Sequence, residues 1–473
     1  MMSPRVTIVI VTWNKKEDVI NLLNSIRGIK YDNFSIVVVD NASTDDTVPA
    51  IKAHDLRVHL IENLENLGGT GGFNTGIQYA ISELAQDYIW LLDNDAEVTP
   101  DTLSELVKAM DGDASLGIAG SCIMSPEDRN LIVEAGAFVD WKSGTWGPNF
   151  RYHRYADLKV ENVIEVDYVA ACSALVRDAV AKELGGMDGR YFLHWDDIDF
   201  CLSIRDLGYR CVSVLSSRVY HGVEKGFNPN VLYYDFRNAL LTISKHLYGY
   251  RKLRAYLSVC FNAFAFMFLE VFQGRSALAH LIFSSITDFI FAIYGKSSKS
   301  VAISDEKDNY ICDSKIEGII LKIIVFVDGA YNDIIATMTK LNNLYPNINI
   351  TLLVNSEKYG ILHSLNVDEV IIANNLKDSI LKKAIIGNKI LFGGFDCGVS
   401  CVSTLNSPYA YLVKKHYTYD SSRDEFFLSD KSIRTIWKVS VAIFMGMVTS
   451  LFSLPVVWSA GLREKRSYGC PKN

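Results

Sequence analysis

Several common protein classes are excluded by what this 473-residue sequence has little of. It holds only 10 Pro and 9 Cys, no Cys-x-x-Cys pair occurs, and Cys397 and Cys401 are the most closely spaced cysteines. Such spacing lacks the paired ligands of a structural zinc site, and the low cysteine density fits reduced thiols in a cytosolic setting. The low proline content, together with 49% hydrophobic residues, excludes an intrinsically disordered chain.

The sequence also predicts neither a generally basic surface nor a cleavable leader. The 47 basic residues are outnumbered by 54 acidic ones, and the net charge of −7 argues against a nucleic-acid partner. Near the N-terminus, the apolar run Val6–Val11 is soon followed by Asn14 and Lys15, which is too early for a signal peptide. We therefore expect the catalytic bulk of the chain to stay on the side of the membrane where it is synthesised.

Apolar and amphipathic segments alternate regularly through the first hundred residues. The pattern predicts strands at Val6–Thr12, Ser35–Asp40, Arg57–Asn63 and Tyr88–Asp93, and helices at Lys16–Ile29, Thr44–His54 and Gly72–Leu84. This alternation predicts an α/β fold with a doubly wound, mostly parallel sheet. Such sheets bind ligands beyond the carboxyl ends of their strands, and the notable polar side chains stand at those ends.

Composition divides the chain into five parts. We predict a catalytic domain at 1–245, an apolar helical membrane-associating region at 246–296, a linker at 297–318, a second smaller α/β domain of unknown role at 319–430, and a hydrophobic helix with a basic tail at 431–473. The elements of the second domain are expected at Ile319–Val327, Asp333–Leu344, Ile348–Val354, Glu369–Ile372 and Lys389–Phe392.

Two apolar stretches explain a mean hydropathy of +0.12, which is high for a soluble enzyme. Ala255–Tyr294 is interrupted by charged residues, so it is interpreted either as packed helices or as helices lying in the plane of a membrane surface. Val439–Leu462 carries no charge and has a length that suits a spanning or re-entrant helix, although Pro455 weakens that interpretation. A buried soluble helix is the alternative for this second stretch.

A pair of carboxylates follows the fourth predicted strand. Asp93 and Asp95 flank Asn94, and two carboxylates at this spacing can converge on one hard cation and its nucleotide phosphates. The same spacing recurs at Asp111-Gly112-Asp113, which we interpret as a loop turn. His221, after the strand-like Val212–Tyr220, becomes a plausible third ligand beside such a pair.

The connection Asn66–Gly76 is rich in glycine, which allows a backbone to approach phosphates closely. It fails as a dinucleotide fingerprint because Asn74 stands where the third glycine belongs, and it lacks the Gly-Lys-Ser/Thr ending of a P-loop. The segment therefore argues against a dehydrogenase and against a P-loop ATPase. At the end of the second strand, Asp40 can accept hydrogen bonds from a base or ribose, with helix capping by Ser43 or Thr44 as the alternative for this segment.

Three carboxylates gather at Trp195-Asp196-Asp197-Ile198-Asp199. Their mutual repulsion is costly unless a cation or a proton relieves it, so one member is expected to be a general base. Trp195 would then be a platform for stacking a sugar. The alternative is an ordinary acidic helix N-terminus.

Taken in order, these motifs resemble glycosyltransferase family 2 over about residues 1–245. The resemblance rests on Val9–Asn14, Val39–Asp45, Asn66–Gly69, Asp93–Asp95, Trp195–Asp199 and His221. It implies a GT-A type Rossmann-like fold, an inverting mechanism, a nucleotide-diphosphate sugar donor and a divalent cation, manganese or magnesium.

The resemblance also implies a role for individual residues. The donor would be bound by Thr12, Asn14, Asp40, Asn41, Asp45, Asn66, Gly69, Asn74, Asp93 and Asn94. The metal would be held by Asp93, Asp95 and His221, and the acceptor by His194, Trp195 and Asp196. Asp197 would be the general base that removes the proton from the acceptor hydroxyl.

Within the family, the segment Gly68–Phe73 and the Trp-Asp-Asp-x-Asp motif are most similar to bacterial galactofuranosyltransferases, and rhamnosyltransferases share much of the pattern. Asn94 departs from it, since the galactofuranosyl relatives carry a third acidic residue there. We expect an enzyme of O-antigen or capsule synthesis that transfers galactofuranose to a glycan, lipid-linked acceptor at the cytoplasmic face of the bacterial inner membrane. A dTDP-rhamnose-dependent enzyme and a non-catalytic sugar-nucleotide-binding scaffold are the alternatives.

Overall fold

The structure is a computed structural model, and it describes the first two thirds of the chain almost continuously. The described residues are 3–222, 228–272 and 275–300, followed by 312–313, 322–327, 331–346, 348–354, 367–372, 395, 397–400, 416–420, 425–429 and 433–467.

Four parallel strands form one side of the first sheet, in the order β3-β2-β1-β4. They are β1 (Val6–Thr12), β2 (Phe34–Asp40), β3 (His59–Glu62) and β4 (Tyr88–Asp93). Most β-branched and aliphatic residues of β1, β2 and β4 are buried, as expected for parallel strands covered by helices on both faces, whereas Leu60 and Ile61 of the edge strand β3 are half-buried. The register pairs Thr12 with Asp40 and Val11 with Asp93. The polar residues at the strand ends are therefore level with one another.

The helices that connect these strands are α1 (Lys16–Ile26), α2 (Thr47–Ala53) and α3 (Gly68–Glu83). The predicted bounds of β1 and β4 are confirmed, whereas α3 begins four residues earlier than predicted, inside the glycine-rich segment. Two of its glycines allow the helix to lie directly on β1. A Cβ atom at Gly72 would lie 2.4 Å from Val11, and one at Gly76 would lie 2.2 Å from Val9.

The other side of the sheet is mixed, where the sequence pattern loosens. β11 (Ser173–Arg177) is antiparallel to both β4 and β6 (Leu116–Met124), and β6 is parallel to β12 (Arg210–Tyr220). Short strands complete the edges: β5 (Glu97–Val98), β7 (Ile132–Glu134) and β10 (Val163–Glu165). The helices of this half are α4 (Thr102–Gly112), α5 (Asp178–Leu184) and α6 (Asp196–Asp206), and a separate hairpin is formed by β8 (Ala137–Asp140) and β9 (Thr145–Pro148).

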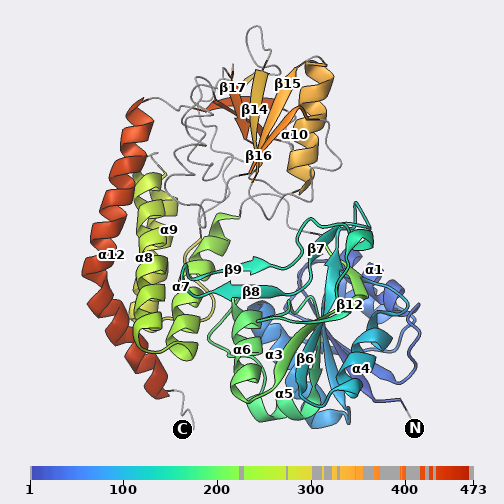
Figure 1. The fold of residues 1–473 in the computed structure, drawn as a ribbon. Helices are drawn as coiled ribbons and strands as arrows, with labels where there is room; N and C mark the ends of the chain where they lie inside the picture. Colours follow the sequence, from blue (N-terminus) through green and yellow to red (C-terminus); the bar gives the residue numbers. More distant parts are fainter. Residues whose placement is uncertain are drawn as a thin grey trace.

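A layer of long helices stands beside this sheet (Figure 1). It consists of α7 (Pro229–His246), α8 (Gly249–Phe272), α9 (Ser276–Ile290) and α12 (Ile433–Ser467). One hydrophobic core runs from the first sheet into this layer, since Val9, Leu240, Tyr256 and Val457 belong to the same buried cluster. The stretch that was expected to span or re-enter a membrane is thus part of a single helix, with Pro455 inside it.

A second, smaller α/β unit lies above the first sheet in Figure 1. Its strands are β13 (Cys312–Asp313), β14 (Lys322–Val327), β15 (Asn349–Val354), β16 (Glu369–Ile372), β17 (Cys397–Ser400), β18 (His416–Asp420) and β19 (Glu425–Ser429), with helix α10 (Tyr331–Leu344). The order is β13-β19-β18-β17-β14-β15-β16. The predicted element Lys389–Phe392 lies outside the described residues. The α/β fold class with following helices and a second α/β unit is confirmed.

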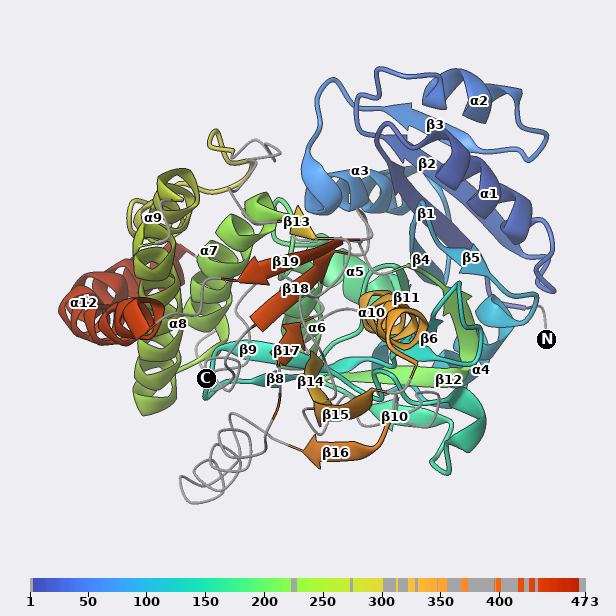
Figure 2. The same ribbon diagram turned by 90° about the horizontal axis from the view of Figure 1, so that it is seen from above.

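The two units share buried side chains. Leu131 and Tyr152 from the first unit pack in the same cluster as Ile334 and Met338 of α10. Figure 2, seen from above, likewise places α10 over the region of β11 and β6.

The close approach of α3 to β1 makes a testable prediction. Gly76→Ala should lower the free energy of unfolding by about 1–3 kcal/mol, because the added methyl overlaps Val9 and the helix must move. Urea denaturation of the full chain, followed by tryptophan fluorescence, measures the effect. Gly112→Ala is the matched control, since a Cβ there meets nothing within 4 Å, and it should be neutral or slightly stabilising. Equal midpoints for the two variants would contradict the prediction.

Candidate active site

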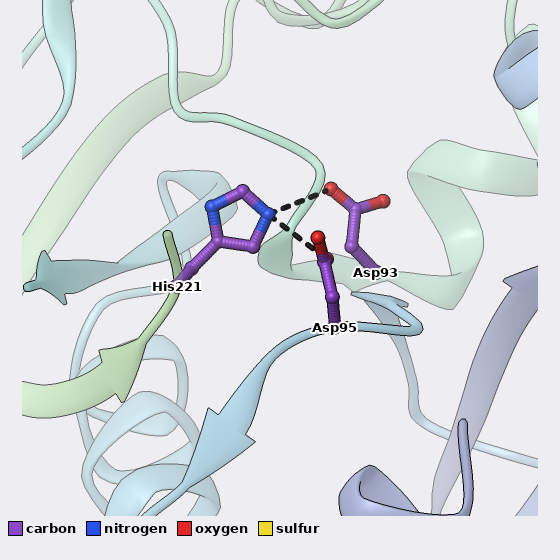
Figure 3. Close-up of side chains that lie close together, drawn as sticks. All are labelled: Asp93, Asp95 and His221. Carbon is purple, nitrogen blue, oxygen red and sulfur yellow. Dashed lines mark ion pairs between the residues drawn. The ribbon is translucent and has the colours of Figure 1, made fainter. Parts of the chain in front are cut away.

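Three side chains from two distant parts of the chain meet at the edge of the first sheet. Asp93 ends β4, Asp95 follows two residues later, and His221 comes directly after β12. Figure 3 shows the His221 ring directed at both carboxylates. Its Nε2 lies 3.0 Å from an oxygen of Asp95 and 3.8 Å from an oxygen of Asp93. The convergence predicted from the sequence is therefore observed.

The electrostatics of this cluster suit a cation. Burial raises the pKa of Asp93 to about 6, although the charge of His221 opposes the shift. Burial would also raise the pKa of Asp95, but the hydrogen bond and charge of His221 outweigh it and lower that pKa. Burial would lower the pKa of His221, yet the bond to Asp95 and the nearby carboxylates raise it. The cluster thus attracts positive charge, and its three donor atoms lie within 4.8 Å of one another.

Two oxygens and one imidazole nitrogen are ligands that manganese accepts, and magnesium needs only one or two carboxylates besides phosphate. The donor set therefore fits the predicted divalent cation. Next to it, the Asn94 amide donates a 3.1 Å hydrogen bond to the hydroxyl of Thr12. This bond joins the ends of β4 and β1 at the site.

Asp40, at the end of β2, keeps one oxygen unpaired. Its Oδ2 accepts a 2.8 Å hydrogen bond from the backbone N–H of Ser43, while the buried Oδ1 has no partner among the described residues. The side chain of Asn14 accepts a 2.7 Å bond from the backbone N–H of Thr44. Asn14 thereby ties the loop after β1 to the loop after β2, and Asp40 retains an acceptor for a ligand.

The other predicted donor-binding residues have internal partners. Asn41 bridges the carbonyl of Gly68 and the amide of Asn63, and Asn66 accepts from the N–H of Gly68. Asp45 is exposed and accepts from the N–H of Thr47 at the start of α2. These bonds shape the loops around the glycine-rich segment.

The oxygen and the nitrogen of the Asn74 side-chain amide are both hydrogen-bonded within the protein. Asn74 bonds to the carbonyl and to the N–H of Met187, at 2.9 Å and 2.7 Å. These contacts indicate that Asn74 holds α3 against the segment before α6. This structural role is the one that the contacts show, and the predicted contact with the donor stays a prediction.

The glycine-rich segment also touches the Trp-Asp-Asp-x-Asp motif directly. The hydroxyl of Thr70 donates a 2.7 Å hydrogen bond to Asp196, and a Cβ at Gly69 would lie 3.9 Å from the same carboxylate. The sequence analysis did not single out Thr70. Its partner is 126 residues away, so no local pattern could have identified it.

His194 and Trp195 lead into α6 through an unusual turn. Both have a positive φ, 62° and 67°, which non-glycine residues rarely adopt and which concentrates at functional sites. The prediction that Trp195 stacks on a sugar is not supported, because the residue is only 5% exposed and packs in the main core. His194 lies 3.3 Å from Asp235 of α7, and this contact raises its pKa although burial opposes the shift.

Asp197, the predicted base, lies in the first turn of α6. Burial, the neighbouring Asp196 and Glu134 together raise its pKa to about 8. Among the described residues it accepts one hydrogen bond, from the N–H of Ile198. Burial raises the pKa of Asp196 as well, with the Thr70 bond opposing. A carboxylate with a raised pKa and a free oxygen is suited to take a proton.

Glu134 is a further acid of this site that the sequence analysis missed. It ends β7, is buried, and one of its oxygens has no hydrogen-bond partner among the described residues. Burial raises its pKa to about 7, with Arg151 and His221 opposing. Its charge also acts on Asp197 and on His221, so Glu134 lies close to the predicted base and to one of the predicted metal ligands.

The third carboxylate of the motif has a structural role. Asp199 is buried and accepts hydrogen bonds from Tyr191, Lys245 and His246, at 3.2, 2.6 and 2.9 Å. Burial would raise its pKa, but the charges and bonds of Lys245 and His246 lower it. Asp199 therefore fastens α6, which carries Asp197, to α7 of the helical layer.

Comparison with known proteins identifies the family of the N-terminal part of the chain. Residues 7–184 match the family model "Glycosyl transferase family 2", so this part of the chain is a family 2 glycosyltransferase domain and the resemblance seen in the motifs is confirmed. The chain is 26% identical over 207 residues to a low-salt glycan biosynthesis hexosyltransferase of Haloferax volcanii, covering 43% of this chain and 62% of that protein.

Two other relatives act on named sugars. The chain is 22% identical over 268 residues to a galactofuranosyltransferase of Mycolicibacterium smegmatis, covering 52% of this chain and 41% of the relative. It is 23% identical over 243 residues to an N-acetylglucosaminyl-diphospho-decaprenol L-rhamnosyltransferase of Mycobacterium tuberculosis, covering 46% and 76%. The chain thus spans less than two thirds of the galactofuranosyltransferase that it matches.

Among solved structures, a mannosyltransferase from Pyrobaculum calidifontis in complex with GDP-Man and Mn2+ is similar, with a TM-score of 0.40 and 18% identity over 62% of this chain and 76% of that one.

The α6–α7 fastening generates a stability prediction. Asp199→Asn should lower the free energy of unfolding by about 3–5 kcal/mol, because Lys245 and His246 lose the buried carboxylate that balances them. Asp206→Asn is the matched control, since Asp206 bonds the other nitrogen of His246 from an exposed position and should cost less than about 1 kcal/mol. Urea denaturation of both full-length variants measures the difference, and a loss of similar size in both would refute the role assigned to Asp199.

Proposed function

We propose that this chain is an inverting glycosyltransferase that moves a sugar from a nucleotide-diphosphate donor to a glycan acceptor. The observation that carries the proposal is the gathering of Asp93, Asp95 and His221 near the raised-pKa carboxylate of Asp197. The family 2 domain that contains the two metal-binding carboxylates supports the same conclusion.

In this proposal the donor lies across the ends of β1, β2 and β4. Asp40 accepts a hydrogen bond from the base or ribose with its unpaired oxygen. Asp93, Asp95 and His221 hold the divalent cation, which, when bound, neutralises charge on the departing diphosphate.

The acceptor hydroxyl is activated by Asp197. As its oxygen attacks the anomeric carbon, a new C–O bond forms, the bond to the diphosphate breaks, and the proton passes to Asp197. A single displacement of this kind inverts the anomeric centre. Thr70 and Asp199 position the base, through Asp196 and through α7.

Galactofuranose is the favoured sugar because of the resemblance in the glycine-rich segment and in the Trp-Asp-Asp-x-Asp motif. A galactofuranosyltransferase and an L-rhamnosyltransferase are both among the relatives, so dTDP-rhamnose is the second candidate donor. The relative that acts on a decaprenol diphosphate supports a lipid-linked acceptor, and one named for amylovoran biosynthesis supports a cell-surface polysaccharide. We place the enzyme at the cytoplasmic face of the inner membrane, where such acceptors meet nucleotide sugars.

The test is a donor screen with the purified full-length chain. UDP-galactofuranose, dTDP-rhamnose and UDP-hexopyranoses are each supplied with manganese, and nucleotide release and sugar transfer are both measured. Turnover of UDP-galactofuranose alone supports the proposal, and turnover of dTDP-rhamnose alone supports the second candidate. Binding of a donor without any transfer would instead indicate a non-catalytic scaffold.

Metal dependence provides the next prediction. Excess EDTA should abolish transfer, and added manganese or magnesium should restore it, because the carboxylates of Asp93 and Asp95 would otherwise face the diphosphate without a cation. Asp95→Ala should lose donor binding, measured by calorimetry. Asp113→Ala alters a carboxylate of the other Asp-x-Asp pair, which accepts bonds from Ser115, and should bind the donor normally. Full activity in excess EDTA would rule out the cation site.

The pKa of Asp197 predicts the pH dependence. Because the base must be ionised and its pKa is about 8, kcat/KM should rise with pH through that value and level off above it. Asp197→Asn should keep the donor affinity and lose turnover by about 10²-fold or more. A flat profile between about pH 6 and pH 9 would remove Asp197 from the role of base.

A further inference from the structure

We propose that α12 binds a lipid bilayer with its axis in the plane of the membrane, through one exposed apolar face, and that it does not cross the membrane. The inference rests on the proposed membrane association and specifies its geometry and surface. It concerns a part of the molecule remote from the carboxylate cluster.

One face of α12 exposes large apolar side chains to solvent. Phe452 is 80% and Phe444 58% exposed, which is far more than core residues show. The exposed face consists of Phe444, Met445, Met447, Leu451, Phe452, Val456 and Leu462. The opposite face is buried against α8, where Gly446 lies against Ala265 and Gly461 against Tyr256. The helix is therefore two-faced between Phe444 and Leu462.

The packing of α8 argues against a spanning arrangement, although α8 and Phe444–Arg463 are both long and apolar enough to cross a membrane. Gly144, in the turn of the β8–β9 hairpin, lies against Val259 in the middle of α8. Lys252 of α8 is buried and bonds to the carbonyls of Ser244 and Gly461. A hydrocarbon layer of about 30 Å around α12 and α8 would have to contain this hairpin and part of α7.

Figures 1 and 2 both place α12 on the outer side of α8, away from the first sheet. Its exposed face can therefore rest on a membrane while the catalytic sheet stays in water. Amphipathic helices of this type lie at the boundary between head groups and acyl chains.

The charges flanking the apolar stretch favour lipid over a second copy of the chain. From Ile433 to Arg463 the sequence has no acidic residue, and basic residues stand at both ends of the stretch: Arg434, Lys438, Arg463, Lys465 and Arg466. In a two-fold dimer along α12, parallel or antiparallel pairing would bring like charges together. Anionic head groups would complement both ends.

The first experiment is flotation of full-length protein with vesicles of phosphatidylethanolamine and phosphatidylglycerol. Wild-type protein should float, and the double variant Phe444→Ser/Phe452→Ser should lose binding by about tenfold or more. Phe138→Ser/Val160→Ser is the matched control, because it removes two similarly exposed apolar side chains from the catalytic unit and should float like wild type. Sedimentation without detergent tests the alternative. If wild-type protein sediments as a dimer and the Phe444→Ser/Phe452→Ser variant as a monomer, a second copy of the chain covers the face.

The second experiment measures depth. Single cysteines are introduced by Phe444→Cys, Leu451→Cys or Leu462→Cys and labelled with an environment-sensitive fluorophore. The background chain has Cys312, Cys401 and Cys470 replaced by Ser. Equal, shallow depths at all three positions support the proposal. A deep label at 451 between two shallow ones would show a spanning helix and leave membrane association standing. Failure of wild-type protein to float would overturn both membrane statements, while transfer to a soluble acceptor tests the catalytic proposal separately.

Discussion

The molecule is organised around the repulsion among carboxylates gathered at one edge of a parallel sheet. Glu134 is buried, Asp93, Asp196 and Asp197 are partly buried, and the loss of water around them is the largest influence that raises their pKa values. Isolated buried charges of this kind are too costly for a fold to keep without compensation. Protons and His221 balance them in the free protein, and a metal-bound donor would do so in the working enzyme. The site is therefore pre-set to attract a cation at one end and a proton at the other.

The compensation extends well beyond the residues that would touch a substrate. Thr70 bonds to Asp196, and Lys245 and His246 hold Asp199, so α3 and α7 both fix the start of α6. This explains how two consecutive residues at positive φ, His194 and Trp195, can directly precede α6. The strained turn is stabilised by the buried ring of Trp195 and by contacts from distant elements.

The parallel half of the sheet and the order of the motifs could be predicted from the sequence, because both depend on local pattern. A run of β-branched residues defines β1, a run of aromatic and aliphatic residues defines β4, and polar residues after parallel strands must meet at one edge. The sequence could not reveal β11, whose antiparallel insertion depends on tertiary packing. The role of Trp195 was misjudged for a related reason, since an aromatic ring beside carboxylates has the same sequence signature whether it is buried or exposed. Glu134 had no signal at all, because its neighbours Asp197 and His221 lie more than sixty residues away along the chain.

The fastening of α6 to α7 also bears on how such proteins can evolve. The family match ends at residue 184, before α6 begins, whereas Asp199 obtains its cationic partners from Lys245 and His246. The segment that matches the family is thus shorter than the segment that holds the contacts between α6 and α7. Recombination with a breakpoint between α6 and α7 would leave the buried carboxylate of Asp199 from one parent facing the α7 helix of another. Successful chimaeras must inherit α6 and α7 from the same parent, so these two helices set the boundary of the module on which selection acts.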